Sequence, residues 1–474
     1  VAAILVMICL YRREGTGAGK MPWIALILAV PIVGMFLFPL LGLNPRLKKT
    51  RTRYAACSKK HVKDTLSQDP AVLKELQATD PYSANIAGYI TGYSSYPLYR
   101  LDSLNYFAEA EDCLEAMKEA LRGAKKSIFM EYAPARDGRI WTELEEILAD
   151  RAKAGVDVRV ICDDMNSIPH GSTGFSRHLQ SRGIKCRVFN AFVPVLNIFL
   201  NNRDHRKLTV VDNMYGFTGG FNLCDEYFHL IRPYGQWKDH GIRLTGEAVN
   251  SLTACFLEMW NLIGKDEPVD GNDTFTSGNA VPPAKDDKSA APKTGGFIQP
   301  FGDSLMCEEK IAENVYISML GAARDYVWFV TPYLVISDEM NRALTLAAKR
   351  GVDVRLITPG IPDRKILSRV TGSYYYQLAE AGVKIYEWTP GFCHCNMAVS
   401  DDRRAMCGTV GLDYRALNHH FENSCMYFDC DAVRDTRDSI EIMLQQSRCI
   451  NESAGGNKRP GLISLALRFF AQLM

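Results

Sequence analysis

Two apolar runs dominate the first 43 residues of the chain. The first, VAAILVMICL, starts at Val1, and the second covers residues 21–43 without a charged side chain. About 20 apolar residues in a helix can span the hydrocarbon core of a bilayer. We therefore expect a transmembrane hairpin over residues 1–43, whose first span is truncated because the chain begins inside it. A buried core helix is the alternative for the second run, whereas a signal peptide would have a shorter apolar core.

Basic residues flank the two runs unequally. Five follow the second run, Arg46, Lys48, Lys49, Arg51 and Arg53, and three lie between the runs, Arg12, Arg13 and Lys20. Because basic residues are retained on the cytoplasmic side of a membrane, this bias predicts that the large carboxy-terminal part is cytoplasmic.

Beyond residue 100 the pattern changes to short strand-like runs that alternate with amphipathic helical stretches. VDVRVI at residues 156–161 and VDVRLI at residues 352–357 are rich in β-branched residues. Each follows a helical stretch that ends at Gly155 or Gly351, and glycine is the residue expected just past a helix. This alternation predicts an α/β fold with helices on the faces of the sheet.

The same succession of runs occurs twice in the same order, at an offset near two hundred residues. The matches are KAGVDVRVI at 153 with KRGVDVRLI at 349, GAKKSIFMEY at 123 with GAARDYVWFV at 321, and GIKCRVF at 183 with GVKIYEW at 382. Such self-similarity indicates one ancestral unit used twice. We assign the two repeats to residues 101–263 and 297–450.

Three further segments complete the predicted organisation. Residues 44–100 form a basic segment and connector. Residues 264–296 are rich in Gly, Pro, Asp, Lys and Ser, which is typical of a flexible linker. The tail, residues 451–474, contains PGLISLALRFFAQLM, which could cap the core or lie in a membrane interface as a short amphipathic helix.

Composition excludes some classes of protein. A chain of 474 residues is long enough for two or three domains. Its formal net charge of +1 does not favour nucleic acid as a partner. The 14 cysteines are scattered along a long chain, which predicts reduced thiols facing the cytosol and no disulfide scaffold.

The candidate chemistry lies in two matched stretches, one in each repeat. HRKLTVVD contains His205, Lys207 and Asp212, and HCNMAVSD contains His394 and Asp401 at the same spacing, with Asn396 in the lysine position. On a strand, the histidine and the lysine of the first stretch would share one face. An imidazole beside an ammonium suits a phosphate substrate, because the imidazole can attack phosphorus and the ammonium can hold its oxygens.

Two such histidines in one cleft would divide the work of group transfer. One would form a phosphohistidine, and the other would protonate the leaving alkoxide and then activate the incoming alcohol or water. No metal or other cofactor is needed if lysines supply the positive charge. One motif taken alone could also be an ordinary surface strand. The CHC of residues 393–395 could suggest a zinc site, but it lacks the second ligand pair of a structural site.

In this combination the sequence resembles the phospholipase D superfamily, and bacterial cardiolipin synthases in particular. The resemblance rests on the duplicated His-x-Lys-x4-Asp pattern, the amino-terminal apolar runs and the stretches TGGFNLCDEY, TPYLVISDEM and GTVGLDYRALNHHFE. It implies an α/β sandwich of two phospholipase D-like repeats related by a pseudo-twofold axis, in the inner membrane of a bacterium. It leaves oligomeric state open, a homo-oligomer included.

The resemblance also implies a reaction. One phosphatidylglycerol would transfer its phosphatidyl group to a histidine and release glycerol, and a second phosphatidylglycerol would accept the group to give cardiolipin. His205 would be the nucleophile, His394 the acid and base, and Lys207 the phosphate-binding cation.

Other residues would support them. Asn222 would be an active-site asparagine, Glu131 and Glu422 would orient the histidines, and Thr409 would support the second half-site. Asp212 and Asp401 would brace the backbone.

The second half-site departs from the family pattern at three positions. Asn396 replaces the lysine, Gly411 replaces an asparagine equivalent to Asn222, and Ala416 replaces a serine. An amide cannot supply the charge of an ammonium, and the loss of such a group costs several kcal/mol of transition-state stabilisation. We therefore expect an impaired enzyme.

Three alternatives remain beside a cardiolipin synthase. They are a phospholipase D-like hydrolase, another phosphatidyltransferase such as a phosphatidylserine synthase, and a catalytically inactive paralogue that binds anionic phospholipid.

Overall fold

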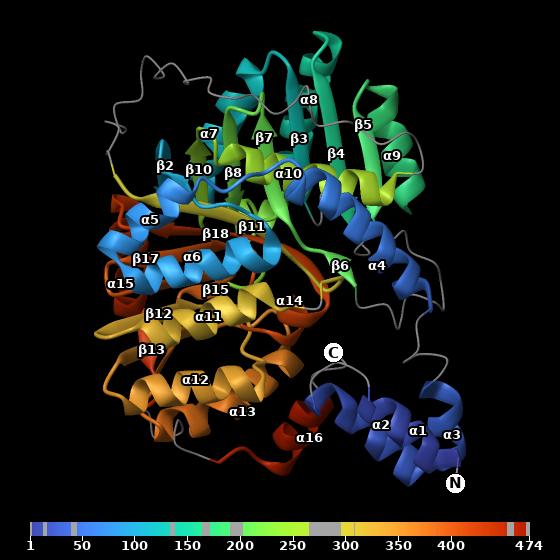
Figure 1. The fold of residues 1–474 in the computed structure, drawn as a ribbon, viewed down its shortest axis with the longest axis vertical. Helices are drawn as coiled ribbons and strands as arrows, with labels where there is room; N and C mark the ends of the chain where they lie inside the picture. The colour runs from blue at the N-terminus through green and yellow to red at the C-terminus, as the bar shows by residue number, and fades with distance from the viewer. Residues whose placement is uncertain are drawn as a thin grey trace.

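The structure is a computed structural model in which two α/β units lie side by side (Figure 1). It describes residues 2–12, 17–38, 45–132, 138–163, 171–189, 202–264, 295–307, 309–452 and 459–470. The linker predicted over residues 264–296 lies almost entirely outside these ranges. The mixed sheets and their covering helices confirm the predicted α/β class.

The first unit is a seven-stranded sheet. Its strands, in spatial order, are β2 (Ser103–Phe107), β10 (Gly241–Thr245), β8 (Tyr215–Gly219), β7 (Lys207–Val211), β3 (Ser127–Tyr132), β4 (Asp157–Asp163) and β5 (Lys185–Phe189). Neighbours from β3 to β5 are parallel, and the other pairs are antiparallel. Its helices are α7 (Ala110–Gly123), α8 (Arg139–Lys153), α9 (Gly171–Ser181) and α10 (Val249–Ile263).

The second unit repeats this strand order. Its equivalent strands are β11 (Phe297–Ser304), β18 (His420–Phe428), β17 (Arg404–Gly408), β16 (Met397–Ser400), β12 (Tyr326–Val330), β13 (Asp353–Pro359) and β14 (Lys384–Trp388). The sheet is extended by β1 (Tyr99–Arg100) beside β11 and by β19 (Ser447–Cys449) beside β14. Its helices are α11 (Ile311–Ala322), α12 (Asp338–Lys349), α13 (Lys365–Glu380), α14 (Tyr414–Asn418) and α15 (Asp431–Gln445).

Two short strand pairings tie the units together, and both adjoin a motif histidine. β6 (Arg203–Asp204) of the first unit pairs in parallel with β18 of the second, where Asp204 lies opposite Phe421. β9 (Gln236–Lys238) of the first unit pairs in parallel with β15 (Gly391–Cys393) of the second. Each histidine is thereby brought against a segment of the other unit.

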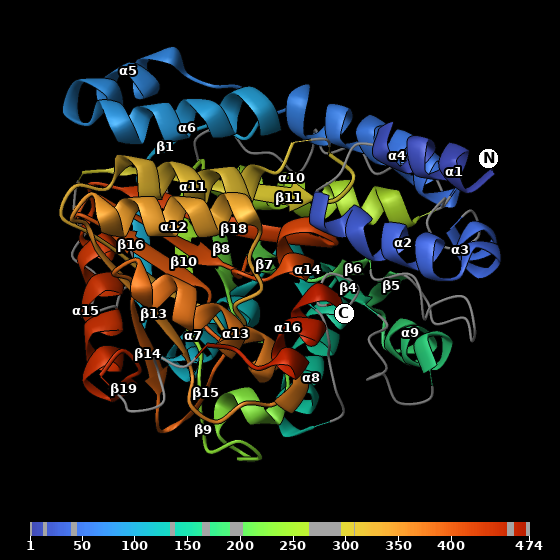
Figure 2. The same ribbon diagram turned by 90° about the horizontal axis from the view of Figure 1, so that it is seen from below.

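The helices between residues 45 and 94 form a layer along one side of both units (Figure 2). α4 (Pro45–Ser58) continues into a π-helical turn at Lys59–Lys63 and packs on α10, while α6 (Pro81–Ser94) packs on α11. α5 (Pro70–Thr79) and α6 each begin with an aspartate cap and a proline in the first helical position. The capping aspartates accept hydrogen bonds from backbone N–H groups that a helix start leaves unpaired.

The helices of the structure do not support the predicted transmembrane hairpin. The described part of residues 2–37 contains three short helices, α1 (Ala2–Arg12), α2 (Gly17–Ala29) and α3 (Pro31–Leu37). Helix α2 ends before Val30, whose φ of −136° and ψ of 76° are not helical, because Pro31 disfavours helical geometry in the residue before it. The 13 residues of α2 rise about 20 Å, which is less than the bilayer core.

Among the residues that the structure describes, no helix combines the length and the apolar character needed to cross a membrane. At the other end of the chain, α16 (Leu462–Phe470) packs on α13 and on α2. Its Arg468 guanidinium lies 3.8 Å from the ring centroid of Tyr374.

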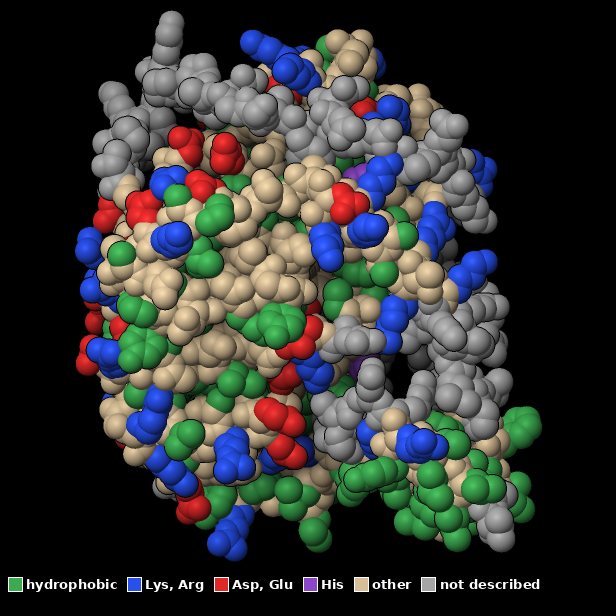
Figure 3. Space-filling model, in the orientation of Figure 1, with side chains coloured by type: hydrophobic (Ala, Val, Ile, Leu, Met, Phe, Trp, Pro, Cys, Tyr) green, Lys and Arg blue, Asp and Glu red, His purple; other side chains and the backbone are tan. Residues whose placement is uncertain are grey.

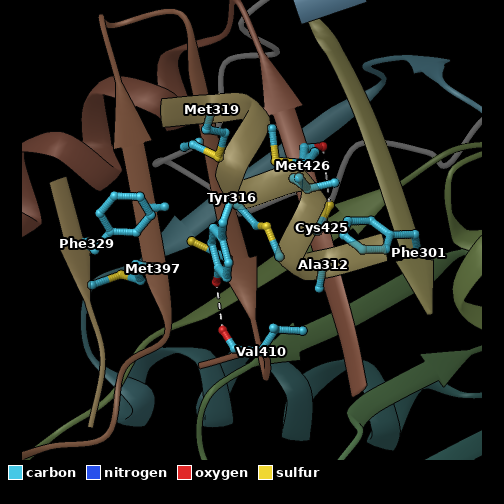
Figure 4. Packing of buried hydrophobic residues seen from close by; sticks show 14 of the residues in the cluster. Phe301, Ala312, Tyr316, Met319, Phe329, Met397, Val410, Cys425 and Met426 are labelled. Carbon is cyan, nitrogen blue, oxygen red and sulfur yellow. Dashed lines mark hydrogen bonds between the residues drawn. The ribbon is translucent and has the colours of Figure 1, made fainter. Parts of the chain in front are cut away.

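The largest apolar core fills the space between the second sheet and its helices, and Figure 4 shows part of it. Tyr316 of α11 is buried there and donates a hydrogen bond of 2.7 Å to the carbonyl oxygen of Val410. This bond fixes the turn after β17, which carries Gly411. All 14 cysteines are free thiols, as the sequence predicts.

Candidate active site

The first motif places an imidazole and an ammonium in contact. The sequence predicts His205 and Lys207 on one strand, but β7 begins at Lys207 and His205 precedes it. The side chains still meet, since Nζ of Lys207 lies 3.0 Å from Nε2 of His205. Burial lowers the pKa of Lys207 to about 8 and the pKa of His205 to about 4. The imidazole is therefore neutral and the ammonium is largely protonated at neutral pH.

Glu422 of β18 contacts the opposite edge of the His205 ring, at Nδ1. Its carboxylate lies 3.0 and 3.1 Å from Nδ1 of His205 and is fully buried. Burial alone would raise the pKa of Glu422, but the adjacent imidazole of His205 and the hydrogen bonds from His205 and His420 lower it to about 2. A carboxylate here accepts the Nδ1 proton, which leaves the lone pair of His205 on Nε2.

The second motif also pairs its histidine with a carboxylate of the other unit. Nδ1 of His394 lies 3.0 Å from Oδ2 of Asp239, which directly follows β9 of the first unit. Burial would raise the pKa of Asp239, but hydrogen bonds from His240 and His394 lower it to about 2. The carboxylate is thus ionised, and the Nε2 atom of His394 is left for a substrate.

The two motif imidazoles lie close to each other. Their ring centroids are 6.4 Å apart, and Tyr227 and Phe392 pack against the ring of His394. A phosphoryl group between the rings would be within reach of both Nε2 atoms and of Lys207. The arrangement can therefore carry out nucleophilic attack on one side of phosphorus and proton transfer on the other.

Asp212 and Asp401 lie away from this site and have equivalent structural contacts. Asp212 accepts hydrogen bonds from the backbone N–H groups of residues 125–127, and Asp401 accepts them from residues 324–326. Both residues have positive φ, 53° and 55°. Each aspartate secures a turn that starts a central strand, which agrees with the expected bracing role.

Asn396 is buried in the second half-site. Its amide nitrogen donates to the carbonyl oxygen of Thr409 at 3.1 Å, while its Oδ1 atom is buried without a hydrogen-bond partner. Thr409 exchanges hydrogen bonds with Asn423, whose Oδ1 atom accepts from the backbone N–H of Lys207 at 2.9 Å. The two motifs are therefore connected through Thr409 and Asn423.

Asn222 lies on the His394 side of the site. Its amide nitrogen donates to the hydroxyl of Tyr227 at 2.8 Å, and its Oδ1 atom is buried without a partner. Ala416, the third departure from the family pattern, is buried in α14 and its backbone N–H bonds to Asp413.

Glu131 does not approach either histidine. It is buried on β3, 4.0 Å from Nη1 of Arg206, which also pairs with Glu258 at 3.0 Å. Burial, reinforced by the nearby Asp204, raises the pKa of Glu131 well above its ordinary value. Of the two predicted orienting glutamates, the structure brings only Glu422 to a histidine.

Sequence reasoning missed Asp239, His420 and Asn423. Asp239 gave no signal, because its partner His394 is 155 residues away and the contact depends on the β9–β15 pairing. His420 and Asn423 flank Glu422 in the stretch HHFEN, so the position of one acid identifies the neighbourhood of all three.

Among the described residues, two groups bring three donor atoms within 4.8 Å of one another: His205, His420 and Glu422, and Asp239, His240 and Cys395. In both groups the carboxylate already pairs with a motif histidine. Pairing between imidazoles and carboxylates is enough to account for these contacts. The expectation that the site needs no metal stays a prediction.

Comparisons with known proteins agree with the duplicated site. Residues 117–260 and 316–444 match the family model described as "Cardiolipin synthase, PLD-like domain". The chain is 29% identical over 461 residues to "Cardiolipin synthase 2" of Bacillus anthracis, covering 93% of this chain and 84% of that protein. It is 28% identical over 457 residues to "Cardiolipin synthase" of Halalkalibacterium halodurans, covering 94% and 88%.

Two further matches bear on the family and on the fold. An uncharacterised protein of Streptococcus mutans serotype c is 36% identical over 454 residues, covering 95% of this chain and 96% of that protein. The crystal structure of phosphatidylserine synthase from Haemophilus influenzae superposes with a TM-score of 0.61 at 15% identity, covering 82% of this chain and 98% of that chain. At that identity the likeness concerns the fold alone.

Proposed function

Because the chain belongs to the cardiolipin synthase family with phospholipase D-like domains, we propose that it is a phosphatidyltransferase. It joins two phosphatidylglycerol molecules into cardiolipin and releases glycerol. The observation that carries the proposal is the pair of imidazoles 6.4 Å apart, with the Lys207 ammonium 3.0 Å from Nε2 of His205. A phosphodiester fits between these groups.

In the first step, Nε2 of His205 attacks phosphorus and the bond from phosphorus to the glycerol oxygen breaks. His394 gives its proton to the leaving alkoxide. In the second step, neutral His394 takes the proton from a headgroup hydroxyl of another phosphatidylglycerol, whose oxygen attacks phosphorus. The phosphorus–nitrogen bond breaks, cardiolipin leaves, and His205 is restored.

The supporting residues act on these two histidines. Glu422 and Asp239 hold the imidazoles in the required tautomer and stabilise each imidazolium as it forms. Lys207 neutralises the charge that develops on the phosphoryl oxygens. Asn222 offers its unpartnered Oδ1 atom to a substrate hydroxyl near His394. Asn396 supplies no charge, and we propose that this slows the reaction.

The test is turnover in phosphatidylglycerol liposomes, with lipid products identified by mass spectrometry. The chain is compared with His205→Asn and Asn396→Lys variants. Cardiolipin and glycerol from the chain, lost in the His205 variant, support the proposal. Phosphatidic acid in place of cardiolipin would identify a hydrolase.

The inactive paralogue is the second candidate, because Asn396 and Gly411 both alter one half-site. It is supported if lipid binds but neither the chain nor the Asn396→Lys variant yields any product.

We also propose that an apolar surface next to α16 rests on lipid. Figure 3 shows hydrophobic side chains gathered at one corner of the molecule, over α1–α3 and α16. Several are highly exposed, among them Leu462 at 86%, Ile32 at 81% and Phe36 at 73%. A contiguous exposed apolar surface marks an interaction site. Helix α4 carries exposed Lys49, Arg51 and Arg53, whose charges suit anionic phospholipid.

Sedimentation with phosphatidylglycerol vesicles tests this surface. Leu462→Glu should weaken partitioning more than about tenfold, because burying one leucine contributes roughly 1.5–3 kcal/mol. Ile442→Glu is the matched control, since Ile442 is an exposed isoleucine on α15, away from the apolar surface. If the two variants partitioned equally onto vesicles, the proposed lipid contact would be refuted, and the proposed reaction would be unaffected.

A further inference from the structure

A third histidine, His420, lies beside the proposed nucleophile. It is the first residue of β18 and lies opposite Arg203 of β6 in the pairing that joins the units. The next residue, Phe421, accepts a hydrogen bond of 2.9 Å from the backbone N–H of His205. The two imidazole centroids are 5.3 Å apart, and the His420 side chain is 11% exposed. His420 is therefore held beside the proposed nucleophile and keeps a small exposed surface.

Glu422 orients both imidazoles. Its Oε1 atom lies 3.1 Å from Nδ1 of His420 and 3.1 Å from Nδ1 of His205. Because Nδ1 of each ring faces the carboxylate, Nε2 of His420 is the atom left for a ligand, while Nε2 of His205 contacts the Lys207 ammonium at 3.0 Å. One buried carboxylate thus presents two Nε2 atoms next to the position of the phosphate.

The charges around the site leave a place for another cation. Glu422 and Asp239 are two ionised carboxylates, and Asp239 faces the imidazoles of His240 and His394. Lys207 is the one lysine of the two motifs, because the second motif has Asn396. A bound phosphodiester adds a further negative charge. Buried charges must be compensated locally, because their desolvation is costly.

We propose that His420, in its protonated form, contacts the substrate phosphate and supplies the positive charge that Asn396 does not. This inference rests on the proposed function of the site. Lys207 and His420 would then bind phosphoryl oxygens, while His205 attacks and His394 transfers the proton. The altered second motif is in this way compatible with turnover.

The charged groups that face His420 come from three elements. Glu422 lies on its own strand, Arg203 and His205 come from β6 and the residue after it, and Asp413 and Arg415 come from the start of α14. Burial raises the pKa of Asp413, and the nearby His420 opposes that rise. A pH response of phosphate binding must therefore be assigned by substitution of His420 itself.

The experiment measures binding of dimethyl phosphate by calorimetry at pH 5.5 and pH 7.5. This phosphodiester stays a monoanion across the range, so a pH response belongs to the protein. The full chain should bind it about tenfold more tightly at the lower pH, as expected for a charge-assisted hydrogen bond. His420→Gln should lose this difference, whereas His419→Gln, a change at the adjacent histidine that contacts Tyr414 edge to face, should keep it.

A double variant separates charge from bracing. If His420 supplies charge, then adding Asn396→Lys to His420→Gln should restore tight binding and make it independent of pH. The inference would be overturned if the double variant did not regain tight binding and Glu422→Gln bound dimethyl phosphate as weakly as His420→Gln. That result would show that His420 only braces Glu422. Unchanged binding in His420→Gln would also overturn it.

Parallel turnover of phosphatidylglycerol by the same proteins keeps the two proposals apart. If the chain makes no cardiolipin but dimethyl phosphate binding follows the expected pattern, the proposed function fails and the role of His420 stands. If cardiolipin forms equally fast with and without His420, the inference fails and the proposed function stands.

Discussion

Gly411 and Asn396, the two altered positions of the second half-site, are packed against each other. A β-carbon built on Gly411 would lie 2.7 Å from Oδ1 of Asn396 and 3.0 Å from Oδ2 of Asp413. Real β-carbons do not approach other atoms so closely. The absence of a side chain at residue 411 is therefore what allows Asn396 its observed orientation, and the two departures form one structural unit.

Gly411→Ala should displace Asn396 and destabilise the protein by about 1–3 kcal/mol, the usual cost of overpacking a buried position. Urea unfolding of the two proteins measures the change. Gly321→Ala is the control, because a β-carbon there meets nothing within 4 Å. If Gly411→Ala proves as stable as that control, the contact between the two positions is not restrictive.

Glu422→Gln should reduce kcat by about 10²–10⁴-fold while His205→Asn abolishes turnover, since a neutral amide no longer stabilises the imidazolium or selects the tautomer. The measurement is product formation, with trapping of the phosphatidyl-protein by acid quench. His178→Gln, which changes a histidine far from the site on α9, should be near wild type. Full activity of Glu422→Gln would rule out an orienting role.

Activity should fall as the pH rises through about 8, because burial lowers the pKa of Lys207 to about 8 and the neutral amine no longer binds phosphate. On the acid side, activity should fall near pH 4, where His205 becomes protonated, since burial lowers its pKa to about 4. Initial rates in liposomes from pH 4 to 10 give the profile. Lys207→Arg should move the alkaline limb upward, and an unchanged limb would assign it to another group.

Stability should decrease steeply in acid. The pKa values of Glu422 and Asp239 are lowered to about 2 in the folded protein, below the ordinary 4.5 and 3.8. Their contribution is thus complete above pH 4.5 and is lost as the pH falls toward 2, where the folded carboxylates take up protons. Urea midpoints at pH 3 and pH 6 measure this, and Glu422→Gln should reduce the difference between them.

Tyr316→Phe should destabilise the protein by about 1–3 kcal/mol, because the buried carbonyl oxygen of Val410 loses the hydrogen bond from Tyr316. Tyr326→Phe removes two exposed hydrogen bonds with Asp402, one donated by the hydroxyl and one accepted from the backbone N–H, and should change stability by less than about 0.5 kcal/mol. Denaturant unfolding compares them. If the two variants lost the same free energy of unfolding, the buried hydrogen bond to Val410 would contribute no more than the exposed ones.

Local pattern in the sequence was enough for the α/β class and for the duplication, because strand and helix periods are set over a few residues. It also singled out His205, Lys207 and His394 as candidates, since a short motif carries its own spacing, and the structure brings their side chains together. The repeated position of Asp212 and Asp401 at the turn after a central strand follows from the same local regularity.

The tertiary structure decided which acid serves which histidine. Glu422 reaches His205 through the β6–β18 pairing, and Asp239 reaches His394 through the β9–β15 pairing, both across the two units. Glu131 is next to the first motif in the sheet, yet it turns toward Arg206. The apolar run at residues 21–43 was long enough for a span, but the chain bends at Val30, before Pro31. Contacts between distant segments depend on strand register and packing, which no short stretch of sequence contains.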